Sequence, residues 1–135
     1  MVQSMEQIKD QIKQSGAMTK GPITEDVIVE AEKKLGFKFP KSYREIIKAL
    51  GVISSDSEEI FGLGVEGYLN VVETTLDERQ LSNGNLNGFV VIQNLGMEGV
   101  LIVVDEKDNV YEYANGKFKN LDCSPAEYII REILV

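Results

Sequence analysis

Two short apolar stripes between residues 24 and 51, each ended by a glycine, constrain the fold of this chain most. Thr24 is a good helix N-cap, and Gly36 supplies a left-handed helix stop. Between them the apolar residues recur at helical spacing, at Val27, Ile28, Ala31 and Leu35. A second stripe follows Pro40, ends at Gly51 and consists of Tyr43, Ile46, Ile47 and Leu50. The sequence therefore predicts two consecutive helices that both face a core.

Shorter helices are predicted on either side of this pair. Residues 4–14 combine a capping-box pattern with a short amphipathic stripe, and residues 15–22 form a connector. Asn70, with Glu73 three positions later, predicts a further helix. The Asn- and Gly-rich segment 82–88 follows it, and we expect an exposed loop there.

The pattern changes to that of strands after residue 88. The runs "GFVVIQN" and "GVLIVVD" are rich in β-branched residues and have the length of strands. "VYEYA" and "FKNL" follow, joined by the hairpin-turn signal Asn115-Gly116. Ser-Pro-Ala-Glu at 124–127 then starts a closing helix. This order predicts an α+β fold, a mainly antiparallel sheet flanked by helices, in a single domain over residues 1–135.

The charge of the chain is strongly uneven along its length. The formal net charge is −8. Residues 1–50 carry nine Lys and Arg against seven Asp and Glu, whereas residues 51–135 carry five against fifteen. Such an acidic surface repels nucleic acid and anionic membranes and suits a basic protein partner. The alternative is that the acidity serves only to keep the protein soluble.

The absence of histidine from the sequence limits the catalytic and metal-binding chemistry that is possible. The chain has no His, so neither a Ser-His-Asp triad nor a Cys–His pair nor the usual His/Cys zinc site is possible. We therefore expect no enzyme activity, no metal and no cofactor. A single cysteine, Cys123, and the lack of an apolar run of membrane-spanning or signal-peptide character favour a cytoplasmic location.

A glycine pattern in "FGLGVEGYLN" raises one alternative. Gly62, Gly64 and Gly67 match the G-x-G-x-x-G of dinucleotide-binding loops. The preceding "SDSEEIF" is too polar for a buried parallel strand, and Glu66 within the motif would repel phosphate. We interpret the glycines as an acidic turn, with nucleotide binding as the alternative.

Other acidic and thiol groups are weaker candidates. The turn 105–109 suggests calcium, but Val110 occupies the position where an EF-hand loop needs glycine, so we expect a solvated hairpin turn. Cys123 lies before a helix beside Asp122, where nothing lowers its pKa, and we expect a partly buried structural residue. The adjacent acids Asp77 and Glu78 are interpreted as surface charge.

Three tyrosines, Tyr68, Tyr111 and Tyr113, are candidates for contact area on a partner surface. Packing in the sheet is the alternative for the last two. We expect one of Tyr111 and Tyr113 to be buried and the other exposed.

The helix pair also carries a family resemblance. "TEDVIVEAEKKLGFKFPKSYREIIKALG" resembles the N-terminal signature of the SUKH superfamily, the Smi/Knr-like proteins. The matching positions are Glu30 or Glu32, Leu35, Gly36, Pro40, Tyr43, Ile47 and Gly51. The order of elements downstream is similar as well, so the resemblance covers a core of about residues 24–133, preceded by the N-terminal helix and connector in 1–22.

This resemblance implies a binding protein, and in bacteria an immunity protein that neutralises a cognate polymorphic toxin domain, often a nuclease. The toxin would present a basic surface. We expect the partner contacts in the acidic loops and their aromatic neighbour, namely Asp56, Glu58, Glu59, Glu66, Tyr68 and Glu98. The scaffold residues would be Leu35, Pro40, Tyr43 and Ile47. A regulatory scaffold with a non-toxin partner is the second hypothesis, and a small nucleotide-binding protein is the third.

Overall fold

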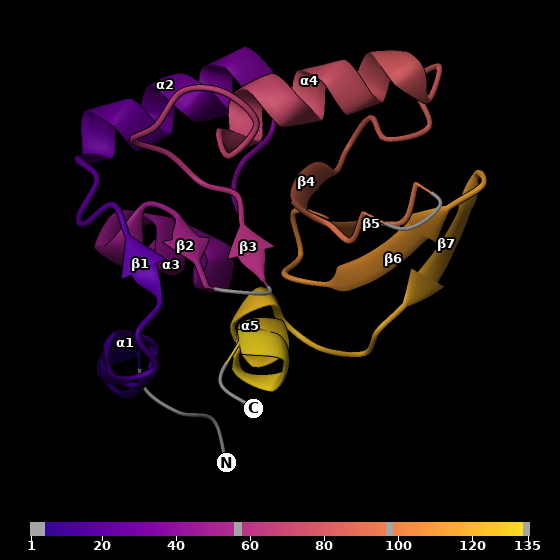
Figure 1. Ribbon diagram of the computed structural model, residues 1–135. Coiled ribbons are helices and arrows are strands. Elements are labelled where there is room, and N and C mark those ends of the chain that lie inside the picture. The colour runs from indigo at the N-terminus through magenta and orange to yellow at the C-terminus, as the bar shows by residue number, and fades with distance from the viewer. Residues whose placement is uncertain (1–4, 56–57, 97–98, 134–135) are drawn as a thin grey trace.

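The computed structural model describes residues 5–55, 58–96 and 99–133 (Figure 1). Its helices are α1 (Met5–Gln14), α2 (Glu25–Leu35), α3 (Lys41–Leu50), α4 (Val71–Leu81) and α5 (Pro125–Ile133). Its strands are β1 (Met18–Thr19), β2 (Ile53–Ser54), β3 (Glu59–Ile60), β4 (Val90–Asn94), β5 (Leu101–Val104), β6 (Val110–Ala114) and β7 (Lys117–Asn120). The predicted α+β fold with antiparallel sheets is confirmed.

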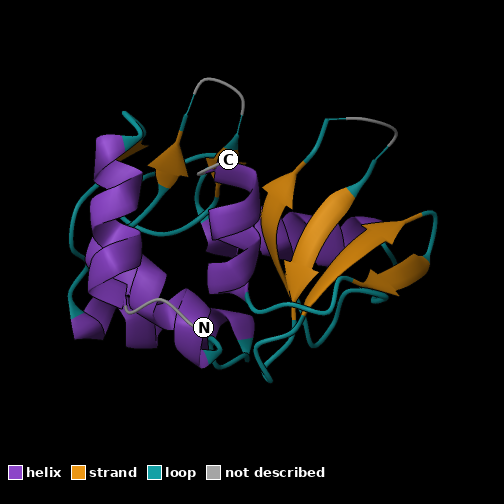
Figure 2. Ribbon diagram, turned by 90° about the horizontal axis from the view of Figure 1, so that it is seen from below, coloured by secondary structure: helices purple, strands orange, loops and turns teal. Residues whose placement is uncertain are grey.

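The strands form two separate sheets. The small sheet has the order β1-β2-β3, and the large sheet is a meander with the order β4-β5-β6-β7, whose strands lie side by side in Figure 2. The β6–β7 turn confirms the Asn-Gly prediction, because Asn115 and Gly116 both have positive φ, at 53° and 75°. The two sheets meet where the Phe61 N–H, just after β3, donates to the Ile92 carbonyl of β4 at 2.7 Å.

The predicted helix pair forms α2 and α3, with one correction. Gly36 ends α2 in the left-handed conformation, at φ 57°, as its sequence position predicted. The expected stripe of α3 is buried throughout, and three of the four residues expected for α2 are buried. Val27 is the exception, with 43% of its surface exposed. It lies one position before Ile28, which is completely buried, so the stripe follows Ile28, Ala31 and Leu35 instead.

The helices enclose one continuous core with the sheets. α1 packs against α3 and α5, α2 against α3 and α4, and α4 lies over β4. Ile8 and Ile12 of α1 are buried in the same core as the helix pair. Tyr43 lies at its centre, completely buried, and its hydroxyl donates to the Phe61 carbonyl. This hydrogen bond ties α3 to the segment that links the two sheets.

The acidic turn 105–109 is the predicted hairpin turn, between β5 and β6, and its tip is exposed, but two of its acids also contact the helix pair. Asp108 accepts hydrogen bonds from the Ser42 N–H at 3.2 Å and from the Ser42 hydroxyl at 2.9 Å. It therefore caps the first turn of α3, whose own N-cap position is Pro40. Glu106 accepts from the Lys38 N–H at 2.7 Å. The β5–β6 turn thus fastens the large sheet to the helix pair.

Two further expectations need correction. The loop 82–88 is exposed or half-buried except at Leu86, which is completely buried and anchors it. Tyr111 and Tyr113 do not divide into a buried and an exposed residue, because they lie two positions apart on one strand and share a face. The rings of both contact Phe118, and Tyr113 is buried while Tyr111 is half-buried.

Candidate partner-binding surface

The glycine loop, residues 61–70, closes on itself at the start of α4. The Gly62 N–H donates to the Leu69 carbonyl at 2.9 Å, and the Val71 N–H donates to the Gly62 carbonyl at 2.8 Å. A Cβ at Gly62 would lie 1.6 Å from the carbonyl oxygen of Gly51. Gly62 is therefore required because two backbone segments touch here, and no bound phosphate is needed to explain it.

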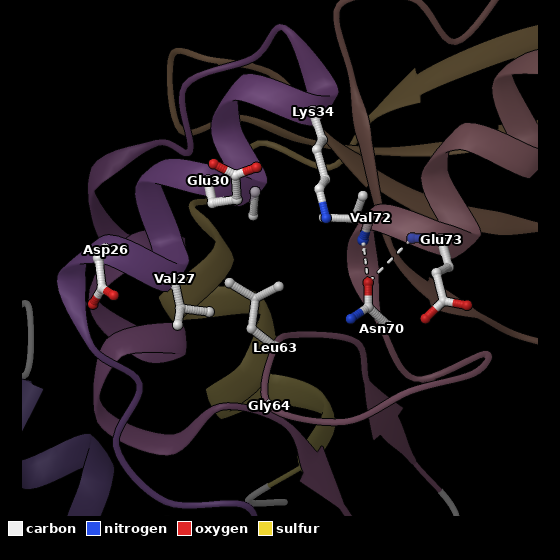
Figure 3. A pocket seen from close by; sticks show the side chains of 10 residues that line it. Asp26, Val27, Glu30, Lys34, Leu63, Gly64, Asn70, Val72 and Glu73 are labelled. Atoms are coloured by element: carbon white, nitrogen blue, oxygen red, sulfur yellow. Dashed lines mark hydrogen bonds between the residues drawn. The ribbon is translucent and has the colours of Figure 1, made fainter.

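The helix terminus behind this loop is already capped by the protein's own groups. The Asn70 side-chain oxygen accepts from the N–H groups of Val72 and Glu73, at 2.9 and 3.1 Å (Figure 3). The Glu73 carboxylate accepts from the Gly67 N–H at 3.2 Å. Donors that would hold a pyrophosphate in a dinucleotide-binding loop thus bind a carboxylate and an amide of the chain itself. The geometry favours the turn interpretation.

Two surface hollows flank this loop, and they differ in charge. The first, of about 540 Å³, lies between α2 and the loop and is drawn in Figure 3. Its walls carry Asp26, Glu30 and Glu73, but also Lys34, which extends toward Val72 in Figure 3. Here the chain supplies a cation of its own.

The second hollow, of about 410 Å³, lies on the other side of the loop, along α4. Its acidic wall consists of Glu73, Asp77 and Glu78, and none of the described residues that line it is a lysine or arginine. Two large side chains on its rim are exposed, Tyr68 by 63% and Leu81 by 74%. The exposed aromatic and leucine side chains make this hollow the candidate partner-binding surface, and its acids would suit a basic partner.

Tyr68 is held in place although it faces solvent. Its hydroxyl donates to Glu59 at 2.9 Å, and this hydrogen bond raises the pKa of the phenol. Its ring packs edge-on against Phe61, with 6.3 Å between centroids, and its carbonyl accepts from the Thr74 hydroxyl at 2.7 Å. A side chain fixed in this way loses little conformational entropy when a partner covers it.

Glu78 is the acid of this wall whose ionised form is disfavoured by its surroundings. It is half-buried, and burial together with the neighbouring Asp77 charge raises the pKa of its carboxyl above the usual 4.5. The one base of α4, Arg79, does not neutralise the Glu78 carboxylate. The Arg79 guanidinium donates to the carbonyls of Leu35 and Phe89, at 2.7 and 2.9 Å, and is thereby committed to the interior.

The structure brings together some of the residues that the sequence analysis singled out. Glu59 and Tyr68 are hydrogen-bonded neighbours, and Glu66 is exposed on the same loop as Tyr68. Glu58 is engaged elsewhere, because it accepts from the Gln93 amide, whose oxygen accepts from the Tyr128 hydroxyl. Asp56 and Glu98 lie outside the described residues.

Comparison with protein families identifies the family to which this fold belongs. The model of the SMI1-KNR4 cell-wall family, SUKH_5, matches residues 1–128. The chain belongs to this SUKH family. No individual curated protein matches it. The family match begins at residue 1, whereas the resemblance in the sequence begins at about residue 24. The additional N-terminal part includes α1, which packs into the same core as the helix pair.

Three further features of this SUKH chain concern metal binding, thiol chemistry and membrane spanning. In the described part of the chain, no three His, Cys, Asp or Glu side chains are arranged to hold a metal ion. Cys123 is buried, and burial raises the pKa of its thiol, which makes it a poor nucleophile. None of the described helices is long and apolar enough to span a membrane.

The place of α4 on this surface was not predicted. Asp77 and Glu78 were interpreted as surface charge, Glu73 only as part of a helix start, and Leu81 had no predicted role. The signal was available, because residues 73, 77 and 81 are four apart and so share one face of a helix. What the sequence does not contain is the neighbour across that face, the loop that carries Tyr68.

Proposed function

We propose that this SUKH protein is an immunity protein that binds a cognate toxin domain one to one and neutralises it by covering its active or substrate-binding surface. The observation that carries the proposal is the pre-organised Tyr68, exposed beside an acidic hollow whose described lining residues include no lysine or arginine. A toxin that acts on nucleic acid must be basic where it grips phosphates. An acidic surface steers onto such a site and occludes it.

Each part of the surface has a role in this proposal. Tyr68 is the anchor, because large aromatic side chains dominate the energy of protein interfaces. Glu59 and Glu66 provide steering and charge complementarity at the rim. Glu58 is a positioning residue for the β2–β3 segment, since its carboxylate is held by Gln93.

Capture from the native host tests the proposal. The bait is the full chain, compared with a variant that carries Glu59→Lys and Glu66→Lys. A matched control carries Glu6→Lys and Asp10→Lys, two exposed acids of α1. We expect the wild type and the control to recover a toxin and to inhibit it in an activity assay. The rim variant should associate about tenfold more slowly at low salt, a difference that shrinks as salt screens the charges.

The outcomes separate the two leading functions. Recovery of a cellular protein with no toxic activity would replace the immunity role by the second candidate, a regulatory scaffold. A toxin complex whose association rate is the same for the rim variant and the wild type would place the interface elsewhere on the molecule.

A further inference from the structure

Another hollow adjoins the one along α4 at Glu78 and Leu81. A cavity of about 270 Å³ lies between the end of α4, the start of β5 and the β6–β7 turn. Glu78 and Leu81 line both hollows. We call these two adjoining hollows the trough. Its lining reaches from Tyr68 past α4 to Tyr113 and Gly116, and opposite the helix lie the glycine loop and the ends of strands.

We propose that this trough holds an extended segment of the partner that carries lysine or arginine at alternate positions. The proposal rests on the proposed function, because the toxin supplies the segment. It goes beyond steering by a diffuse acidic surface, since it assigns one shape and one charge pattern to the bound chain.

The dimensions favour an extended occupant. α4 has 11 residues and is therefore about 16 Å long. About five residues of extended chain cover the same length. Because alternate side chains of an extended chain point to the same side, every second residue of the occupant faces α4.

The acids of the α4 wall and the apolar groups opposite them indicate which residue types the bound segment should carry. The α4 wall offers Glu73, Asp77 and Glu78, and neither hollow is lined by a lysine or arginine among the described residues. A cation beside Glu78 would offset both the burial of its carboxylate and the repulsion from Asp77. The opposite wall is formed by Leu101, Tyr113 and Gly116, which suit small or apolar side chains at the intervening positions.

A different hollow provides an internal comparison. The one between α2 and the glycine loop shares Glu73 with the trough and adds Asp26 and Glu30, but Lys34 also lines it. It needs no external cation, so a basic peptide should prefer the trough. Glu30 in that hollow is an exposed glutamate of a helix and serves as a matched control for Glu78.

A peptide titration tests the docking surface without the toxin. The ¹⁵N-labelled full chain is titrated at low salt with the blocked hexapeptide Arg-Ala-Arg-Ala-Arg-Ala and with its Gln-Ala counterpart. We expect saturable shifts of the amide signals of Tyr68, Glu78, Leu81 and Gly116 with the arginine peptide only. Glu78→Gln should weaken binding about fivefold, the effect of one partly desolvated charge pair, and Glu30→Gln should leave it unchanged.

Three results would overturn the inference. They are shifts that gather in the α2 hollow or spread over all acidic surface, equal effects of Glu78→Gln and Glu30→Gln, and the absence of saturable shifts. Failure of the proposed function has a different signature. If the captured partner is not a toxin but its binding shifts the trough residues, the docking surface stands and the immunity role fails.

Discussion

The two halves of the chain use charge in different ways. The ion pairs found among the described residues all lie between residues 6 and 48. Arg44 bridges Glu25 of its neighbouring helix and Glu32, the latter at 3.5 Å, and Lys48 adds a contact to Glu25 at 3.8 Å. In the described residues from 58 onward, by contrast, no acid forms an ion pair, although the excess of acids lies there.

The acids of the second half divide into two groups. Some hold loops in shape through neutral donors. Asp105 accepts from two backbone N–H groups and from the Tyr111 hydroxyl, and Asp108 caps α3. Others, such as Asp77 and Glu78, line the trough, where none of the described lining residues is a lysine or arginine. The net charge of this half is therefore partly structural, and the proposal assigns the remainder to a partner.

The largest expected effect separates a scaffold tyrosine from a surface tyrosine. Tyr43→Ala removes a fully buried ring and leaves the Phe61 carbonyl without its donor, so we expect a loss of about 3–5 kcal/mol in the free energy of unfolding. Tyr68→Ala removes a ring that is 63% exposed, so stability should change by about 1 kcal/mol or less while partner binding falls strongly. Urea denaturation and binding measured on both variants check this pair.

A similar loss of stability in both variants would contradict the division between scaffold and binding surface. Tyr43→Phe serves as the control for packing, because it retains the ring and removes only the hydroxyl that donates to Phe61. It should lose less stability than Tyr43→Ala.

An effect of intermediate size is expected at Asp108, whose hydrogen bonds with Ser42 join the second half of the chain to the first. Asp108→Ala removes the cap of α3 and places alanine at a φ of 67°, so we expect a loss of about 2 kcal/mol. Asp108→Asn retains an oxygen acceptor and a residue that tolerates this φ, so it should lose much less. Thermal denaturation of the two variants measures the difference. Equal losses would mean that the charge, and neither the cap nor the backbone conformation, is what matters.

Local signals in the sequence predicted the helices and strands, whereas contacts between elements distant in the sequence were not predicted. The α2–α3 pair, the Asn115-Gly116 hairpin and the start of α5 follow from caps, glycines and periodicity within a few residues. In α5 the predicted capping box is present, with Ser124 and Glu127 exchanging hydrogen bonds at 2.9 and 3.2 Å.

The missed features each depend on a long-range neighbour. Asp108 gained its role from Ser42, which is 66 positions away. Val27 was assigned to the core because a stripe alone does not say which of two adjacent residues faces inward. The same holds for the candidate site, where the loop acids were predicted and the α4 wall that completes the trough was not.

The smallest expected effect tests the charge comparison itself, with one glutamate from each half. The hydrogen bond from Arg44, aided by the charges of Arg44 and Lys48, lowers the pKa of Glu25 below its usual 4.5. Burial and Asp77 raise that of Glu78 above 4.5. Ionised Glu25 therefore stabilises the folded state above pH 4.5, and this contribution is lost as pH falls through its lowered pKa. Ionised Glu78 destabilises it above its raised pKa, and the penalty disappears below pH 4.5.

Replacement by glutamine should consequently have opposite signs in the two halves. At pH 7 we expect Glu25→Gln to lower Tm slightly and Glu78→Gln to raise it slightly, and both differences should vanish in acid, because each glutamate is then neutral in either state. Thermal scans from pH 3 to 7 at low salt measure both. A loss of stability on Glu78→Gln would mean that the second half compensates its charges internally, as the first half does. A gain in stability together with weaker partner binding is instead the pattern of a residue kept for function at a cost to stability.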